Sequence, residues 1–213
     1  MYRIALLCYC LLFVAHLSAQ DIEQETLRPH EFILAFGAAS SAEGSVFNLP
    51  ADDVHASPDF SFYLGYYYSL SERLAVGGHF FGYSQTINDV GIIDASSTFK
   101  IVSFNLAPMH LGLQVRYMLM TGSVEPFVSA MANIVVGSLE NKEYGTLTMF
   151  GYGAGGTAGV RVYIFDSVTF SIHGYGAFGS ASFKKNPFLN SIGKDFNPSM
   201  AGVIFGLAYH WGD

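Results

Sequence analysis

Histidine and serine are the residues of this chain that could most readily transfer a proton or act as a nucleophile. His79, His110, His173 and His210 all fall within segments that alternate like strands, and Ser171 precedes His173 by two residues. A strand would place Ser171 and His173 on one face. A nucleophilic serine, however, needs a base within hydrogen-bond reach and a third group that orients the base. No carboxylate has a spacing that would supply this group, so the sequence predicts no catalytic residues.

Metal and cofactor sites are not expected either. The histidines are scattered, and the only cysteines, Cys8 and Cys10, lie in the N-terminal apolar segment, so no Cys/His cluster is indicated. The glycine-rich stretch 151–156 is not followed by the Lys-Ser/Thr pair of a phosphate-binding loop. We therefore predict no metal ion and no cofactor.

Arg116 and Arg161 are the most informative residues for the interior of the fold. Each alternates with apolar residues, which predicts that its side chain points away from an apolar face. An arginine in a narrow interior needs acceptors or water. We predict a self-satisfied, rigidifying polar network of Gln114, Arg116, Asn133, Thr157, Arg161, Tyr163 and His173. A gated proton or ion path is the alternative interpretation.

Strands must position these side chains, and the alternation typical of a strand is clearest in the C-terminal segment. Its alternate residues share one apolar face, made up of Ala201, Val203, Phe205, Leu207, Tyr209 and Trp211. Similar alternation predicts seven further strands, at residues 30–40, 59–70, 74–83, 104–119, 125–138, 148–165 and 168–179. In a soluble sandwich the apolar rows would face a core, whereas in a membrane barrel they face lipid, with aromatic residues at the interface.

The links between these segments favour the membrane barrel. Three links are short, at residues 71–73, 120–124 and 166–167, and they alternate with longer polar links at 41–58, 84–97, 139–147 and 180–198. This rhythm is typical of a barrel with one end in a narrow compartment and exposed loops at the other. Hydrophobic residues make up 51% of the chain and charged residues 13%, yet no helix-length apolar run follows residue 20. A soluble sandwich or lipocalin-like barrel is the alternative.

The N-terminal segment predicts export. Arg3 carries the positive charge, residues 4–15 are apolar, and small residues surround Ala19. This is the pattern of a cleaved signal peptide, and the apolar run is too short to span a bilayer comfortably. We expect residues 1–19 to be a signal peptide, cleaved at about Ala19 or Gln20, and residues 20–213 to be the barrel domain. A retained anchor is the alternative.

From residue 30 onwards the sequence resembles the small eight-stranded outer-membrane β-barrels of Gram-negative bacteria, the OmpA/OmpX type. The resemblance rests on the signal peptide, the strand rhythm, the stretch Leu106–Tyr117 and the aromatic final strand. It implies an all-β, eight-stranded antiparallel transmembrane β-barrel in the outer membrane, with both termini on the periplasmic side. It also implies outer-membrane lipid, lipopolysaccharide and the barrel-insertion machinery as partners. Pro108 predicts a bulge in the fourth strand, because proline cannot donate to the ladder.

We expect any recognition to reside in the loops of a monomeric protein. Acidic residues outnumber Lys and Arg by 17 to 10, so no basic patch for nucleic acid is indicated. An eight-stranded lumen is just wide enough for side chains. The predicted role is therefore structural or surface interaction without enzymatic activity. Lys184, Lys185 and Lys194 could contact lipopolysaccharide phosphates, or pair with Asp52 and Asp53. A small porin-like pore or a lipid A-modifying enzyme is the alternative.

Overall fold

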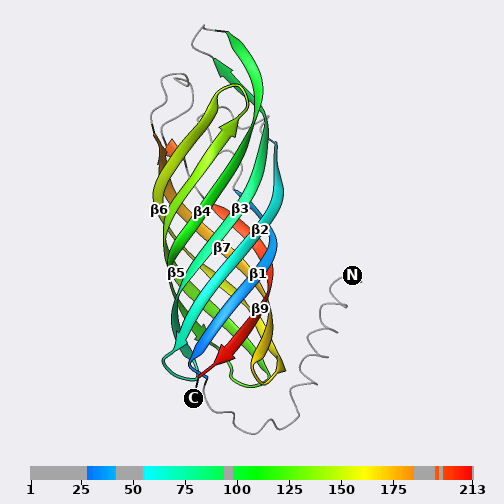
Figure 1. Cartoon of the computed structure of the whole chain (residues 1–213), viewed down its shortest axis with the longest axis vertical. Helices are drawn as coiled ribbons and strands as arrows, with labels where there is room; N and C mark the ends of the chain where they lie inside the picture. Colours follow the sequence, from blue (N-terminus) through cyan, green and yellow to red (C-terminus); the bar gives the residue numbers. More distant parts are fainter. Residues whose placement is uncertain (1–27, 42–54, 94–97, 185–194, 197–198, 213) are drawn as a thin grey trace, which may run out of the picture.

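Eight long antiparallel strands form a closed ring in the computed structural model of this chain (Figure 1). The structure describes residues 28–41, 55–93, 98–184, 195–196 and 199–212. The strands are β1 (His30–Ser41), β2 (His55–Ser69), β3 (Leu74–Ile93), β4 (Phe99–Met118), β5 (Val124–Asn141), β6 (Gly145–Phe165), β7 (Val168–Phe183) and β9 (Met200–Trp211). A two-residue strand, β8 (Asp195–Phe196), pairs with the end of β7. In these ranges no helix is long and apolar enough to cross a membrane.

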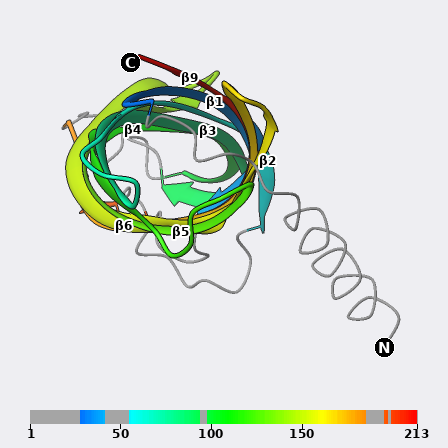
Figure 2. The same cartoon turned by 90° about the horizontal axis from the view of Figure 1, so that it is seen from below.

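The ring closes because β9 pairs with both β1 and β7, and Figure 2 shows the strands in this ring. The stagger of the ring is found by following cross-strand pairs from Ile33 to β7 in both directions. Through β2, β3, β4, β5 and β6 the pairs reach Gly179, whereas through β9 they reach Thr169, so the two directions differ by ten residues. Given the usual rise and spacing of strands, this stagger corresponds to a strand tilt of about 41°. The predicted eight-stranded antiparallel barrel is confirmed.

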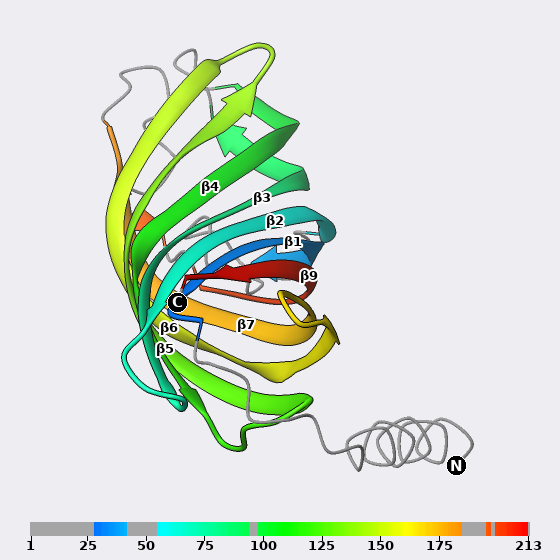
Figure 3. The same ribbon diagram turned by 60° about the horizontal axis from the view of Figure 1, so that its bottom comes forward.

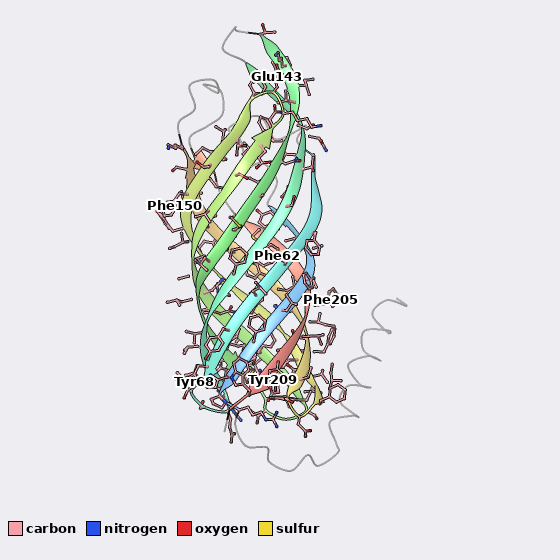
Figure 4. All side chains as sticks on the ribbon, viewed as in Figure 1. Phe62, Tyr68, Glu143, Phe150, Phe205 and Tyr209 are labelled. Carbon is pink, nitrogen blue, oxygen red and sulfur yellow. The ribbon has the colours of Figure 1, made fainter. Side chains whose placement is uncertain are left out.

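Alternation gives the barrel an apolar outside. On β9, Phe205, Leu207 and Tyr209 are about half exposed, whereas Ile204 and Ala208 face inward and are buried. Figure 4 shows Phe150 and Phe205 on the outside of the barrel. Outside the register shifts in β2, β3 and β6, the strands keep the same period of two, so one slip in register would exchange the two faces. The lipid-facing and inward rows predicted for β9 are therefore the rows that the structure has.

A cluster of aromatic rings lies over the adjacent strands β1, β2 and β9, at the end of the barrel where the short turns lie. We call His30, Tyr66, Tyr68, Tyr209 and Trp211 the turn-end girdle. The ring of His30 stacks on Trp211 with centroids 5.5 Å apart, and a 2.7 Å hydrogen bond joins His30 Nδ1 to the Tyr66 hydroxyl. Figure 4 places Tyr68 and Tyr209 at this end. Amphipathic rings at one height are typical of a membrane–water interface.

At the opposite end the strands extend beyond the predicted boundaries. β3 continues to Ile93 and β4 begins at Phe99, so the predicted loop 84–97 is wrong for residues 84–93. The β3–β4 and β5–β6 hairpins rise above the rest of the barrel (Figures 1 and 3). The prediction ended each strand where its outward apolar row ended. Backbone pairing needs no apolar side chain, however, and outward residues such as Thr86 and Asn105 continue the ladder.

The predicted long link at 139–147 is also wrong, because β5 and β6 are joined by a tight turn. Asn141 Oδ1 accepts hydrogen bonds from the backbone N–H groups of Glu143 and Tyr144, at 2.7 and 3.0 Å. Gly145 then adopts a φ of 79°, a conformation that favours glycine. Asn and Gly at these positions are ordinary turn residues. The strict alternation of long and short links therefore fails at this hairpin.

Pro108 does not produce the predicted bulge. The pairs Gly82–Met109 and Gln85–Leu106 share one register, so the β3–β4 ladder resumes unchanged on either side of the proline. The β4–β5 ladder runs through Pro108 without a shift. We infer that the proline nitrogen faces β3, where it interrupts the hydrogen bonds without displacing the strand.

Candidate functional site

The lumen is the candidate site, because it holds nearly all the buried polar side chains. Of the seven residues predicted to form one network, six are buried, namely Gln114, Arg116, Asn133, Thr157, Arg161 and His173, and Tyr163 is partly exposed. The structure places five of them in three successive groups rather than in a single network, whereas the rings of His173 and Tyr163 pack against other aromatic rings. The groups are a set of ion pairs, a hydroxyl–amide group and a polar chamber.

The ion cluster, which consists of Glu31, Glu125, Arg116 and Arg161, lies nearest the short turns. Glu31 Oε2 accepts hydrogen bonds from Arg116 Nη2 and Arg161 Nη1, each at 2.5 Å. Arg161 Nε also donates to Glu125 Oε2. Glu31 is 1% exposed and Arg116 is 2% exposed. Two carboxylates therefore balance two guanidinium groups in a buried layer, so removal of any one member leaves an uncompensated charge.

The barrel topology explains how the ion cluster spans the lumen. Glu125 on β5 is the direct cross-strand partner of Arg161 on β6. Glu31, by contrast, projects from β1, which is not adjacent in the ring to either β4 or β6. Its carboxylate therefore reaches across the interior to both arginines. The Arg116 guanidinium also lies 4.1 Å from the centre of the Tyr67 ring, a cation–π contact.

Glu31 and Glu125 are the two members of the ion cluster that sequence reasoning missed. The available signal was alternation, because Phe32, Leu34 and Phe36 form an outward row and Glu31 must then face inward. Alternation gives the face of a strand but not the partner across the ring. That partner depends on the ten-residue stagger, which the sequence alone does not provide.

The hydroxyl–amide group lies next along the lumen and is centred on Gln114. Gln114 Oε1 accepts hydrogen bonds from the hydroxyls of Tyr63 and Tyr67, at 2.8 and 2.6 Å. Gln114 Nε2 donates to Ser129 Oγ and to Thr157 Oγ1, the latter at 3.2 Å. One side chain therefore ties together β2, β4, β5 and β6.

The polar chamber consists of His79, His110, Asn133, Tyr83 and Tyr175. All five are buried, yet both ring nitrogens of each histidine, both amide atoms of Asn133 and both tyrosine hydroxyls lack a well-formed hydrogen bond to protein. The histidines pack edge-on or stacked against aromatic rings: His79 stacks on Tyr63, and His110 meets the edge of Tyr175. Buried polar groups are nearly always satisfied, so we expect water within this chamber.

An apolar group lines the interior towards the loop end. Its buried members come from β3 to β7 and are Ile87, Phe104, Leu106, Leu139, Leu147, Met149 and Ala181. They were not predicted, since several lie in stretches taken as loops. The lumen therefore changes along its length from apolar at the loop end, through polar, to charged at the turn end.

Of the remaining candidates, His210 has a hydroxyl partner: its Nε2 forms a 3.0 Å hydrogen bond with Thr169 Oγ1, and its Nδ1 lies 3.7 Å from Glu31 Oε2. Ser171 Oγ has no hydrogen-bond partner, so it is not paired with His173. Among the side chains that the structure describes, no three of His, Cys, Asp and Glu gather so as to hold a metal ion. Lys184 is exposed at the end of β7. Lys185, Lys194, Asp52 and Asp53 lie outside the described residues, as does the predicted signal peptide, 1–19.

Comparison with known proteins finds similarity in structure only. No protein-family model matches the sequence, and no curated protein matches it significantly. Neisserial surface protein A superposes with a TM-score of 0.54 at 12% identity, covering 85% of this chain and 97% of that one. The outer membrane protein OprG of Pseudomonas aeruginosa gives a TM-score of 0.52 at 15% identity, covering 86% and 97%. The outer membrane protein AlkL gives a TM-score of 0.50 at 12% identity, covering 91% and 95%.

These likenesses agree with the observed ring of strands, the apolar outer face and the polar lumen. At such low identity they show the fold alone and transfer no activity. The chain has the fold of the small eight-stranded outer-membrane β-barrel proteins.

Proposed function

We propose that this protein is a monomeric outer-membrane β-barrel with a closed lumen, and that its exposed loops carry recognition without enzymatic activity. The apolar outer face supports the membrane location, because Leu113, Phe150 and Tyr152 are each at least 65% exposed. Within a bilayer, a closed ring satisfies backbone groups that would otherwise be costly. The two longest links, between β1 and β2 and between β7 and β9, lie at the end opposite the termini, which favours an orientation with the termini in the periplasm.

One observation is the main support for the proposal that the lumen is closed. Glu31 crosses the interior and bonds to both Arg116 and Arg161, so the turn end is occupied by paired charges. A continuous water path would have to displace these ion pairs or the Gln114 group beside them. With an interior of this size, little space is left for substrate or for a conducting column.

The absence of enzymatic activity is supported by the arrangement of the candidate residues. The Ser171 hydroxyl, the candidate nucleophile of the sequence analysis, has no hydrogen bond to His173 and so lacks the adjacent base that would activate it. We expect no change in lipid A when purified protein and lipid A are incubated together and the product is examined by mass spectrometry. A new lipid A species that depends on Ser171 or His173 would contradict the proposal.

The proposed role of the loops in recognition can be tested by substituting three lysines of the β7–β9 link. Glutamate substitutions at Lys184, Lys185 and Lys194 reverse six units of charge, since each replaces +1 with −1. If these lysines meet lipopolysaccharide phosphates, the triple variant should bind lipopolysaccharide more weakly, and salt should reduce wild-type binding. The control is Arg73→Glu, which changes two units of charge in the turn at the other end of the barrel. Equal binding by all three proteins would exclude this link as the contact.

A small water-filled pore is the second candidate, and the polar chamber favours it. The polar atoms of His79, His110 and Asn133 are buried without well-formed hydrogen bonds to protein. Water there would make the middle of the lumen permeable, leaving the ion cluster as the barrier. Steady conductance by the wild-type protein would support the pore over the closed barrel.

A further inference from the structure

The lipid-facing wall of the barrel is hollowed over β3 and β4. One hollow, of about 700 Å³, has Gly78 and Gly112 at its floor. Large apolar side chains form its walls, including Leu64, Phe80, Leu111, Leu113 and Ile134. We call it the β3–β4 hollow. A second hollow, of about 650 Å³, lies over Gly82 further along the same two strands.

The glycine at position 78 creates this hollow, although strand packing does not require glycine there. Gly78 belongs to the outward row of β3, between Val76 and Phe80. A Cβ atom at Gly78 would meet only the Gly112 carbonyl oxygen, at 3.7 Å, which is ordinary contact. At neighbouring Gly77, by contrast, a Cβ would lie 2.1 Å from the Tyr66 carbonyl oxygen. The backbone therefore demands glycine at position 77 but tolerates a side chain at position 78.

The hollow begins at the turn-end girdle. Tyr66 lines it, and the Tyr66 hydroxyl is bonded to His30 at the interface end. If the apolar face lies in a bilayer, as the proposed function holds, hydrocarbon is the only solvent available to the hollow. An empty apolar hollow would forfeit dispersion contacts on its lining. A chain lying in it would touch protein on several sides, whereas a chain on the smooth wall touches protein on one.

We propose that the β3–β4 hollow binds one acyl chain of a phospholipid, taken from the leaflet at the turn end. The ester end of the lipid lies beside Tyr66 and the chain runs over Gly78 between Phe80 and Leu113. This proposal rests on the membrane location given in the proposed function. It adds a discrete lipid site on the outer wall, separate from the lumen and from the loops.

The test fills the hollow without disturbing the backbone. Gly78→Leu places an apolar side chain where the acyl chain would lie. Gly174→Leu is the matched control: Gly174 is an exposed glycine on β7, where a Cβ would be 3.8 Å from its nearest neighbour, the Ala158 carbonyl oxygen. Both variants add the same group to the outside of the barrel, and only the first adds it to the hollow.

Native mass spectrometry of the refolded proteins in dodecyl maltoside, titrated with dioleoyl phosphatidylethanolamine, counts the lipids bound. We expect one saturable lipid on the wild type and on Gly174→Leu. For Gly78→Leu, the leucine side chain occupies the space of the acyl chain and removes its dispersion contacts with the hollow, so saturable binding should be lost or weakened severalfold. Quenching of Trp211, the single tryptophan, by a brominated phospholipid should show the same order, because its ring is 6.1 Å from that of Tyr66.

The outcomes separate this proposal from the membrane location. Equal lipid affinity in the wild type and Gly78→Leu overturns the acyl-chain site, as does a wild type that inserts into vesicles but binds no saturable lipid. A dimer mass in the wild type that Gly78→Leu abolishes also overturns it, because a second copy then occupies the hollow. A wild type that does not insert into vesicles at all refutes the proposed function itself.

Discussion

Replacement of Arg161 by leucine should destabilise the barrel far more than the same replacement at the next residue. Arg161 donates to Glu31 and Glu125, both of which are buried. In Arg161→Leu, Glu31 keeps Arg116 but Glu125 loses its ion-pair partner. Breaking a buried ion pair from one side costs about 3–5 kcal/mol. Val162 faces outward beside it, so Val162→Leu should change stability by less than about 0.5 kcal/mol.

Urea unfolding in lipid vesicles, followed by Trp211 fluorescence, gives the two midpoints. We expect a clearly lower midpoint for Arg161→Leu than for Val162→Leu. The double variant Arg161→Leu with Glu125→Leu should recover part of the loss, because replacing both partners by apolar residues removes the uncompensated charge. Equal midpoints for the two single variants would refute the buried ion cluster. A double variant less stable than Arg161→Leu would refute the assignment of the loss to Glu125.

Three further results are expected. Circular dichroism in detergent should be β-dominated and unheated protein should migrate anomalously on a gel, whereas a mainly helical spectrum would refute the fold. Gly145→Ala, at a φ of 79°, should cost about 1 kcal/mol or more in urea unfolding, while Gly176→Ala, where a Cβ meets nothing within 4 Å, should not; equal effects would contradict the turn geometry. Gln114→Leu should cost about 1–3 kcal/mol by leaving the Tyr63 and Tyr67 hydroxyls without their shared acceptor, and an unchanged midpoint would count against that group.

Much of the barrel could be predicted because alternation is a local property. The row Val203, Phe205 and Leu207 fixes which face of β9 is apolar, and the outward orientation follows directly. Strand ends were less predictable. Thr86 and Asn105 extend β3 and β4 beyond the apolar belt, where hydrophobicity no longer marks a strand.

The lumen was predictable residue by residue but not as an arrangement. Arg116 and Arg161 were expected to need acceptors, and the structure supplies them. That the main acceptor is Glu31, far away in sequence on β1, depends on the stagger of the closed ring. The hollow over Gly78 was missed for a similar reason, since a glycine on a strand shows its surroundings only once neighbouring strands are in place.

Planar-bilayer conductance of the refolded protein tests the closed lumen most directly. The wild type should show no steady conductance, because the ion cluster fills the turn end. A triple variant with alanine at Glu31, Arg116 and Arg161 should conduct more than the wild type if it remains folded by gel mobility, since side chains no longer fill the turn end of its lumen. A large, steady single-channel conductance from the wild type would contradict the account and assign the protein to the pores.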